Sequence, residues 1–512
     1  MRRFLLLSLL IGLTMAFSGC SAAKEEAAAF PSAGWPTAGW RTCTPEEQGI
    51  DSAKLADGLT AIRERGLNIH SLLIIRNGWV VLDASFYPYD GQALHDQASV
   101  TKSIMTTLIA ISVDQGKLKL DDPVLSFFPG RRSANQDAVK ERITVRHLAS
   151  MSSGLDCTSA NDEQTLHEME RTDDFVQFIL GRKMVAEPGT RFVYCSPGMH
   201  LLSAILQKAT GMTTLEFARK NLFEPLGIRN VIWPADPQGL NHGWGDIRLH
   251  PHDTAKIGFL WLNGGQWEGR QIVSKSWVED SVKTQIKTGR DDDYGYGWWI
   301  TGQEGEYAAI GRGGQRIQVW PSINAMLVMT GGGVDIDDIE PFLEPAFADL
   351  SKPLPANPAG QARLEEAFAA IRKPPAPKPV APLPATAANI SGKAFDFEPN
   401  PLEIKTLELE FTGPAEAVLK IKHDDGEITS WPVGLDGVYR FSTGEYGLPQ
   451  GLRGEWLDDR TFAAEYDNIG NNDHILLRMR FEGDLLIVES RETAHELGFR
   501  FEGRAAKRLP RP

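Results

Sequence analysis

A serine and a lysine three residues apart, Ser99 and Lys102, have the types and spacing that suit nucleophilic chemistry. Residues three apart on a helix project from the same face, so a hydroxyl and an amine can meet there. Burial among few charges disfavours the ammonium form, and a neutral lysine can take the serine proton. A helix N-terminus at Ser99 also offers backbone N–H groups to a developing oxyanion. We therefore expect Ser99 to be acylated and Lys102 to take part in proton transfer.

Ser-x-x-Lys is a weak signal by itself, because a second copy occurs at Ser21 and Lys24. The two copies differ in their context. The run from Ser99 to Gln115 is the most apolar predicted helix of the chain and ends at Gly116, whereas Ser21 lies in a polar segment without periodicity. Only the copy at Ser99 is therefore predicted to be helical and buried.

The order of predicted elements around this helix indicates the fold. A helix is predicted for Asp51 to Arg65, followed by a β-hairpin with its turn at Asn77-Gly78. Helical segments then dominate to about Gly264, and strand-like runs return at Gln315 to Trp320 and Ala325 to Thr330. This order predicts an α/β (α+β) body, in which both ends form an antiparallel sheet flanked by a helical region from the middle.

The rest of the chain divides by composition. Lys373 to Pro384, KPPAPKPVAPLP, has too few apolar side chains for a core and is expected to be an extended spacer. Beyond about Ala388, short runs of alternating polarity separated by glycines predict a small all-β sandwich or barrel. The predicted organisation is a signal peptide over 1–20, a tether over 21–45, the α/β body over 46–353, a helix and Pro/Ala-rich linker over 354–387, and the all-β domain over 388–512.

Composition and absent motifs exclude several function classes. The 512 residues carry a net charge of -14 without a basic face for phosphates, which argues against nucleic-acid binding. No His-Glu-x-x-His, paired Cys-x-x-Cys or Gly-x-Ser-x-Gly pattern occurs, so we expect no metal, no cofactor and no α/β-hydrolase fold. His250-Pro251-His252-Asp253 is interpreted as a helix start capped by Asp253, because Pro251 prevents a shared helical face for metal ligands.

The N-terminus is predicted to be a bacterial lipoprotein signal peptide. Two arginines precede the apolar run Phe4 to Phe17, which is too short for a comfortable membrane span, and Ser18-Gly19-Cys20 follows. Small residues before Cys20 resemble a lipobox, in which the cysteine is lipidated. Plain secretory cleavage is the alternative, because Phe17 departs from the usual aliphatic residue. The protein is thus expected in the cell envelope, facing the periplasm or exterior, with membrane contact only through the lipid anchor.

Two further segments complete a pattern with Ser99 and Lys102. Tyr194-Cys195-Ser196 precedes a predicted helix, and Gly311-Arg312-Gly313-Gly314-Gln315 opens a predicted strand. In this order the segments resemble the motifs of the serine β-lactamase and penicillin-binding-protein family, especially its esterase and aminohexanoate-oligomer hydrolase branch. The resemblance covers about residues 46–350.

The resemblance implies a role for each motif. Tyr194 would relay a proton to the serine and the leaving group, and Ser196 would take the place of the second motif's third residue. The third motif would line the opposite wall of the site, and Gln315 would supply the second oxyanion N–H. The implied reaction is a two-step acyl transfer on a small ester or amide, in which water releases the acyl group from Ser99.

Departures from the family pattern shift the expected chemistry away from β-lactams. Arg312 stands where penicillin-recognising members carry Lys or His, and Ser196 where many carry Asn. Arg312 stays cationic, so it is expected to bind a carboxylate and not to act as a base. Lys287-Thr288-Gly289 is a literal copy of the third motif, but a charged stretch follows it, so we prefer Gly311 to Gln315. A non-catalytic cell-envelope binding protein is the alternative function.

Three cysteines besides Cys20 allow at most one disulfide within the chain. We favour Cys157 with Cys195, since both lie beside motif segments and export permits disulfides, while three free buried thiols are the alternative. Substrate selectivity is expected to depend on the loops near Thr158 to Thr172 and Asp236 to Asp246, which carry no recognisable code. The sequence indicates no oligomeric state.

Overall fold

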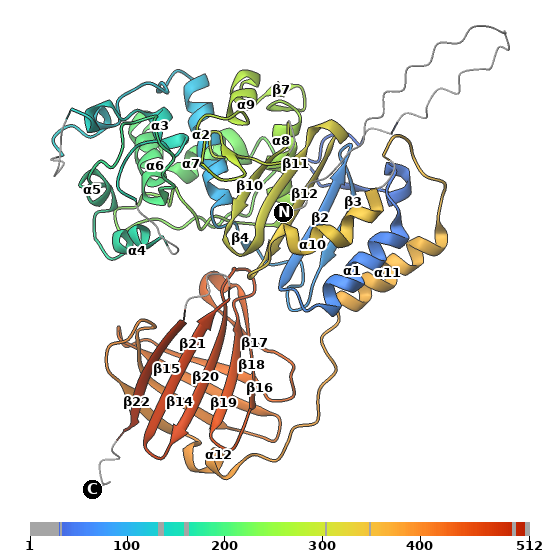
Figure 1. The fold of residues 1–512 in the computed structure, drawn as a ribbon, viewed down its shortest axis with the longest axis vertical. Helices are drawn as coiled ribbons and strands as arrows, with labels where there is room; N and C mark the ends of the chain where they lie inside the picture. Colours follow the sequence, from blue (N-terminus) through green and yellow to red (C-terminus); the bar gives the residue numbers. More distant parts are fainter. Residues whose placement is uncertain are drawn as a thin grey trace.

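The computed structural model describes residue 30 and residues 33–131, 138–157, 163–302, 305–347, 350–493 and 498–506. The predicted signal peptide and Cys20 lie outside the described residues. Figure 1 shows two parts, a body in which helices cover a sheet and a separate barrel joined to it by a long connection. Among the described residues, no helix combines the length and apolar character needed to cross a bilayer.

Within the described residues, an eight-stranded sheet forms the centre of the body, with the order β1-β3-β2-β12-β11-β10-β9-β8. Only the pairing of β1 with β3 is parallel. The strands are β1 Arg41–Thr42, β2 Ile69–Arg76, β3 Trp79–Ser85, β8 Asp293–Tyr294, β9 Trp299–Ile300, β10 Tyr307–Gly311, β11 Gln315–Trp320 and β12 Ala325–Gly331. The sheet therefore confirms the prediction that both ends of the body pair in an antiparallel arrangement.

Both faces of this sheet are covered, which explains why β2 is buried along its whole length. Leu72 and Ile74 pack with helices on one face, and Leu73 and Ile75 pack with helices on the other. The first face carries α1 Ser52–Glu64, α10 Ile336–Leu343 and α11 Pro358–Arg372, whereas the second core contains α2 Val100–Asp114, α3 Val145–Ala149, α4 Gln164–Glu170, α5 Phe175–Leu180, α6 Ser196–Thr210, α7 Thr214–Ala218, α8 Pro251–Leu262 and α9 Lys275–Ser281.

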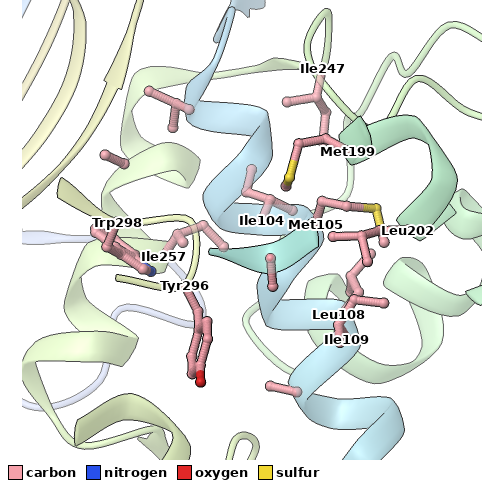
Figure 2. Packing of buried hydrophobic residues seen from close by; sticks show 14 of the residues in the cluster. Ile104, Met105, Leu108, Ile109, Met199, Leu202, Ile247, Ile257, Tyr296 and Trp298 are labelled. Atoms are coloured by element: carbon pink, nitrogen blue, oxygen red, sulfur yellow. The ribbon is translucent and has the colours of Figure 1, made fainter. Parts of the chain in front are cut away.

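α2 is buried on nearly every side. Ile104, Met105 and Leu108 have no exposed surface. Figure 2 shows α2 surrounded by side chains of other elements, among them Met199, Leu202, Ile247, Ile257, Tyr296 and Trp298. The predicted burial of this helix is confirmed, and its first turn, where Ser99 is the N-cap, is held in place by the core.

Two sequence expectations about helices in the body need correction. The boundary at 353 assigned the following helix to the linker, but Leu364 and Ile371 of α11 pack into the core with α1, so the body extends to Arg372. The start of α8 was predicted to be capped by Asp253. The observed N-cap is His250, whose ring accepts a hydrogen bond from the His252 N–H, because Pro251 occupies the first helical position.

The C-terminal domain is a closed barrel of ten strands within the described residues, ordered β16-β15-β14-β13-β22-β21-β20-β19-β18-β17 and closed by β16 with β18. Its strands are β13 Lys393–Phe397, β14 Ile404–Phe411, β15 Glu416–His423, β16 Ile428–Gly434, β17 Arg440–Thr443, β18 Pro449–Trp456, β19 Thr461–Asp467, β20 His474–Glu482, β21 Leu485–Glu492 and β22 Gly498–Ala505. Alternate residues such as Leu407, Phe462 and Met479 fill the interior. Of the two predicted forms, sandwich and barrel, the barrel is the one present.

The connection between the two parts follows the barrel surface. The Lys378 N–H donates to the Asp436 carbonyl oxygen at 2.8 Å, and α12 Ala385–Ile390 precedes the first barrel strand. In Figure 1 the connection, in light orange, runs down one side of the barrel, and loops at the opposite end of the barrel reach the body near β4. β4 His95–Asp96 pairs with β5 Arg248–Leu249, directly before the start of α2. A second short hairpin joins β6 Gln266–Trp267 to β7 Arg270–Gln271.

Candidate active site

The structure brings Ser99 and Lys102 into direct contact at the start of α2. Lys102 Nζ and Ser99 Oγ are hydrogen-bonded at 2.6 Å, and Nζ also donates to the Trp244 carbonyl oxygen at 2.7 Å. Ser99 is partly exposed, whereas Lys102 is buried. A reactant can therefore reach the hydroxyl, while the amine is shielded from water.

The buried position of Lys102 changes its protonation. Desolvation lowers the pKa of Lys102 to about 8, although the negative charges of Glu163 and Asp246 act in the opposite direction. A lysine with this pKa is neutral in an appreciable fraction of molecules near neutral pH. It can accept the proton of Ser99, as the sequence predicts.

Tyr194 lies over the same pair. Its hydroxyl is hydrogen-bonded to Ser99, and Lys102 Nζ lies 4.9 Å from the centre of its ring. Desolvation and the charge of Glu163 raise the pKa of Tyr194, so the phenol stays protonated. Trp299 stacks on the ring with centroids 6.1 Å apart. Tyr194 is thus placed as a protonated group that can pass a proton on.

The turn that presents Ser99 is strained and leaves a donor open. Ala98 has a φ of 44°, in the left-handed region that a residue with a Cβ rarely adopts. Its N–H donates to Asp96 Oδ1 at 3.1 Å. Within the described chain the Ser99 N–H has no hydrogen-bond partner, and a Cβ on Gly311 would lie 3.0 Å from this nitrogen. The open N–H and the end of β10 together form one side of a candidate oxyanion hole.

The third motif forms a tight turn between β10 and β11. Gly313 and Gly314 have φ values of 79° and 98°, and a Cβ on Gly314 would lie 2.5 Å from the Val334 carbonyl oxygen. Both positions therefore require glycine. The glycines shape the wall through their backbone.

The prediction that the Gln315 backbone supplies the second oxyanion N–H needs correction, because Gly311 is the motif residue next to the Ser99 nitrogen. Gln315 is fully buried, and its amide donates to the carbonyl oxygens of Arg312, at 3.1 Å, and Gly331, at 2.6 Å. It lies on β11, whereas Gly311 on β10 is the motif residue in close contact with Ser99. The Gln315 side chain braces the turn, and the backbone at 311–312 is better placed for the second oxyanion N–H.

Arg312 and Ser196 are also placed differently from the prediction. Arg312 Nη2 lies 3.2 Å from Asp473 Oδ1 of the barrel, so its charge already faces a carboxylate of this chain. Ser196, the first residue of α6, is 2% exposed, and its hydroxyl has no hydrogen-bond partner among the described residues. A direct substrate contact by Ser196 is not supported, because its oxygen is closed off from the surface.

The loop from 236 to 246, one of the two expected to affect selectivity, forms a further wall of the site. The sequence did not single out the residues within it. His242 stacks on Trp244 with centroids 4.1 Å apart and hydrogen-bonds through Nδ1 to Asp246 Oδ2 at 2.6 Å. Trp244 in turn holds Lys102 through its carbonyl oxygen. The loop from 236 to 246 therefore orients the lysine. Backbone contacts of this kind leave no residue-type signal in a sequence.

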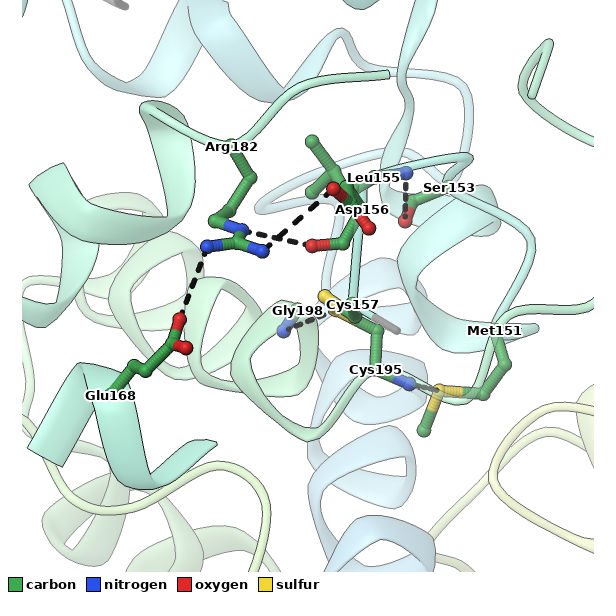
Figure 3. Close-up of a disulfide and its surroundings, with 9 residues drawn as sticks. All are labelled: Met151, Ser153, Leu155, Asp156, Cys157, Glu168, Arg182, Cys195 and Gly198. Carbon is green, nitrogen blue, oxygen red and sulfur yellow. Dashed lines mark hydrogen bonds and ion pairs between the residues drawn. A yellow bond between two sulfur atoms is a disulfide. The ribbon is translucent and has the colours of Figure 1, made fainter. Parts of the chain in front are cut away.

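The predicted disulfide between Cys157 and Cys195 is present, with Cα atoms 5.2 Å apart. Figure 3 shows it beside the start of α6, where the Gly198 N–H donates to Cys195 Sγ at 3.2 Å. Because Cys195 follows Tyr194 directly, the bridge fixes the chain next to the tyrosine. Cys43 is the free cysteine of the described chain.

Ser99 is hydrogen-bonded to a buried lysine, and a tyrosine ring lies beside the pair. The helix that carries the pair packs on a largely antiparallel sheet. These features define a serine hydrolase with a penicillin-binding-protein-like fold. The model of the family described as Beta-lactamase matches residues 57–331, which are more than half of the chain, and the chain therefore belongs to this family. This confirms the resemblance found in the motifs. The protein is a serine hydrolase that acts on ester or amide bonds.

Individual relatives are distant. The 6-aminohexanoate-dimer hydrolase of Paenarthrobacter ureafaciens is 25% identical over 321 residues, which are 57% of this chain and 81% of that protein. A solved structure from Bacillus anthracis, assigned as a 6-aminohexanoate-dimer hydrolase, has a TM-score of 0.50 and 17% identity, covering 66% of this chain and 89% of its own. EstCE1, a hydrolase with promiscuous acyltransferase activity, has a TM-score of 0.50 and 17% identity, and the match covers 58% of this chain and 99% of EstCE1. The two solved structures support the fold.

The pKa of Lys102 leads to a prediction for the pH dependence of acylation. Below about pH 8 the lysine is mainly protonated and cannot accept the serine proton, so the acylation rate should rise with pH and level off above about 8. Pre-steady-state release of nitrophenol from an activated ester, measured from about pH 6 to about pH 10, reports this rate. Lys102→Arg should lower it about 10²- to 10⁴-fold, because the guanidinium stays charged. A wild-type rate that does not change over this range contradicts the role of Lys102.

The disulfide leads to a prediction for stability. Replacing both cysteines, Cys157→Ser with Cys195→Ser, should lower the free energy of unfolding by roughly 2–4 kcal/mol, because the unfolded chain loses a covalent loop constraint. Denaturant titration of the double variant against Cys43→Ser measures this difference. Thiol titration of the unreduced Cys20→Ala chain should detect one thiol, that of Cys43. Detection of three would refute the bridge.

Proposed function

We propose that the protein hydrolyses a small ester or amide by two-step acyl transfer, with Ser99 as nucleophile, Lys102 as base and Tyr194 as proton relay. The observation that carries this proposal is the 2.6 Å contact between Lys102 Nζ and Ser99 Oγ at the accessible end of a buried helix. Desolvation, which favours the neutral lysine, supports the same assignment.

The steps follow from these positions. Ser99 Oγ attacks the carbonyl carbon while its proton moves to Lys102 Nζ. The oxyanion is stabilised by the Ser99 N–H and by a second N–H from the backbone at 311–312. Tyr194 passes a proton to the leaving oxygen or nitrogen and regains one from Lys102. Water then attacks the acyl carbon and loses a proton to the same groups. These groups return the proton to Ser99 Oγ as the bond to the acyl carbon breaks, and the carboxylic acid leaves.

The charges around the third motif favour substrates without a carboxylate at that wall. Arg312 faces Asp473, and this ion pair offsets the charge that would otherwise attract an anion. An ester or amide is therefore preferred over a penicillin, whose recognition needs a carboxylate-binding group. The named activity of the Paenarthrobacter ureafaciens relative supports a short amide oligomer as one substrate to test, beside simple carboxylic esters and D-amino-acid peptides.

Intact-mass measurement tests the proposal directly. A fluorophosphonate should add one group to the wild-type protein and none to Ser99→Ala, because the probe reacts with an activated serine. Ser126→Ala, which removes an exposed hydroxyl outside the site, serves as the matched control and should label fully. Benzylpenicillin should leave the mass unchanged. A wild-type protein without any adduct would instead indicate the non-catalytic binding protein.

The proposed location is the outside of a bacterial cell membrane, with Cys20 as the lipid attachment point. This proposal rests on the sequence of the first twenty residues. Metabolic labelling with a fatty acid in a bacterial host should mark the wild-type chain, and Cys20→Ala should abolish the label while leaving export intact. Labelling of Cys20→Ala at the wild-type level contradicts the anchor.

A further inference from the structure

A loop of the barrel lies directly against the residues that lead to Ser99. This loop, residues 468–473, connects β19 to β20 and is called here the β19–β20 loop. The Asp96 N–H donates to the Gly470 carbonyl oxygen at 2.7 Å. A Cβ on Gly470, which has a φ of 116°, would lie 2.8 Å from the Leu94 carbonyl oxygen. The two main chains are therefore packed closely enough that glycine is needed at the contact.

Asn472 of this loop has no exposed surface and donates from Nδ2 to Asp96 Oδ2 at 2.6 Å. The other oxygen of Asp96 accepts the Ala98 N–H at 3.1 Å. Ala98 holds the strained backbone conformation immediately before Ser99. Two hydrogen bonds thus connect a barrel side chain to the turn that presents the nucleophile.

The same loop also contacts the opposite wall of the site. Asp473 Oδ1 pairs with Arg312 Nη2 at 3.2 Å, and a Cβ on Gly313 would lie 2.6 Å from Asn472 Cβ. A second barrel loop places the ring of Tyr446 4.5 Å from the guanidinium of Arg248. Arg248 lies on β5, where its backbone is opposite Asp96 of β4. The barrel therefore reaches both the start of α2 and the third motif.

We propose that the barrel completes the active site, and that Asn472 is a positioning residue that acts through Asp96 on the Ala98–Ser99 turn. The inference rests on the proposed function, because it takes Ser99 as the nucleophile. Asp96 needs two donors to hold the turn, and Ala98 and Asn472 provide one each. Removal of Asn472 would leave one oxygen of a buried carboxylate without its donor and release the turn.

The cost of the arrangement supports a functional reason for it. Asn472 Oδ1 is buried without a hydrogen-bond partner among the described residues, and such an acceptor costs roughly 1–3 kcal/mol. Burial and the charge of Asp246 raise the pKa of Asp96 to about 6, against the opposing charges of Arg248 and Arg312. The amide of Asn472 is a donor that remains uncharged at every pH, so it stabilises ionised Asp96 without adding a charge.

The first test removes the donor. Asn472→Ala should lower kcat for a neutral ester about 10- to 100-fold with little change in KM, because the nucleophile is misplaced after binding. The fluorophosphonate should still label Ser99 to completion, but more slowly. Absence of an adduct on the wild-type protein would reject the proposed function instead, so the two failures are distinguishable.

Two barrel variants control for a general loss of structure. Phe441→Ala removes a ring that packs on Tyr87 of the body, and Asn400→Ala removes an amide that donates to the Ile404 carbonyl oxygen within the barrel. Both should retain wild-type kcat even where thermal unfolding shows a lower melting temperature. An equal loss of kcat in Phe441→Ala overturns the specific role of Asn472.

A second variant gives a signature that a merely structural residue does not produce. In Asn472→Asp the new carboxyl can donate to Asp96 only when it is protonated, since two carboxylates this close cannot both ionise. The ratio of variant to wild-type acylation rate should therefore rise as the pH falls, and the contribution of Lys102 cancels in the ratio. At pH values well above the pKa of Asp96, about 6, the same ratio for Asn472→Ala should stay flat. A flat ratio for Asn472→Asp, or a folded Asn472→Ala with kcat within about twofold of wild type, overturns the proposal.

Discussion

The chemistry of this protein depends on keeping water away from one ammonium group. Lys102 is useful as a base only because burial lowers its pKa to about 8, and that burial comes from a helix with hardly any exposed side. An amphipathic surface helix would leave the amine solvated and charged at neutral pH. The sheet, the helices of the second core and the aromatic residues Tyr194 and Trp299 all contribute to the dry surroundings of this one group.

Around that group the fold accepts local costs. Ala98 is in the left-handed region, and the Ser99 N–H and the Ser196 hydroxyl lack hydrogen-bond partners among the described residues. Strain and unpaired polar groups of this kind cost of order 1–3 kcal/mol each and persist only where surrounding packing imposes them. The Ser99 N–H is the one with a clear use, because an oxyanion can pair with it during the reaction. No use is evident for the Ser196 hydroxyl.

Local signals predicted a large part of the fold and the centre of the site. The apolar run after Ser99, the Asn77-Gly78 turn and the alternation in the C-terminal domain each depend on near neighbours in the chain, and each element formed as expected. The errors arose where a role depends on distant residues. A family motif gives the position of Gln315 but not that Gly311, on the neighbouring strand, is the residue in contact with Ser99. Likewise, helical spacing in α11 does not reveal that α1 covers it.

The contact between Arg312 and Asp473 is the clearest case of information that no local pattern contains. The two residues are 161 positions apart and belong to different parts of the molecule, so the pairing exists only after the barrel has docked. A partly exposed ion pair adds little stability, and the hydrogen bond from buried Asn472 to Asp96 brings a desolvation cost. Such contacts provide orientation, because an arginine, a carboxylate and an amide each form hydrogen bonds only in defined directions. Apolar contacts alone would not fix the position of the docked barrel, because the hydrophobic effect is non-directional, whereas the close contact between Gly313 and Asn472 leaves no room for movement. The polar contacts are therefore best understood as fixing the register of the barrel against the turn that presents Ser99.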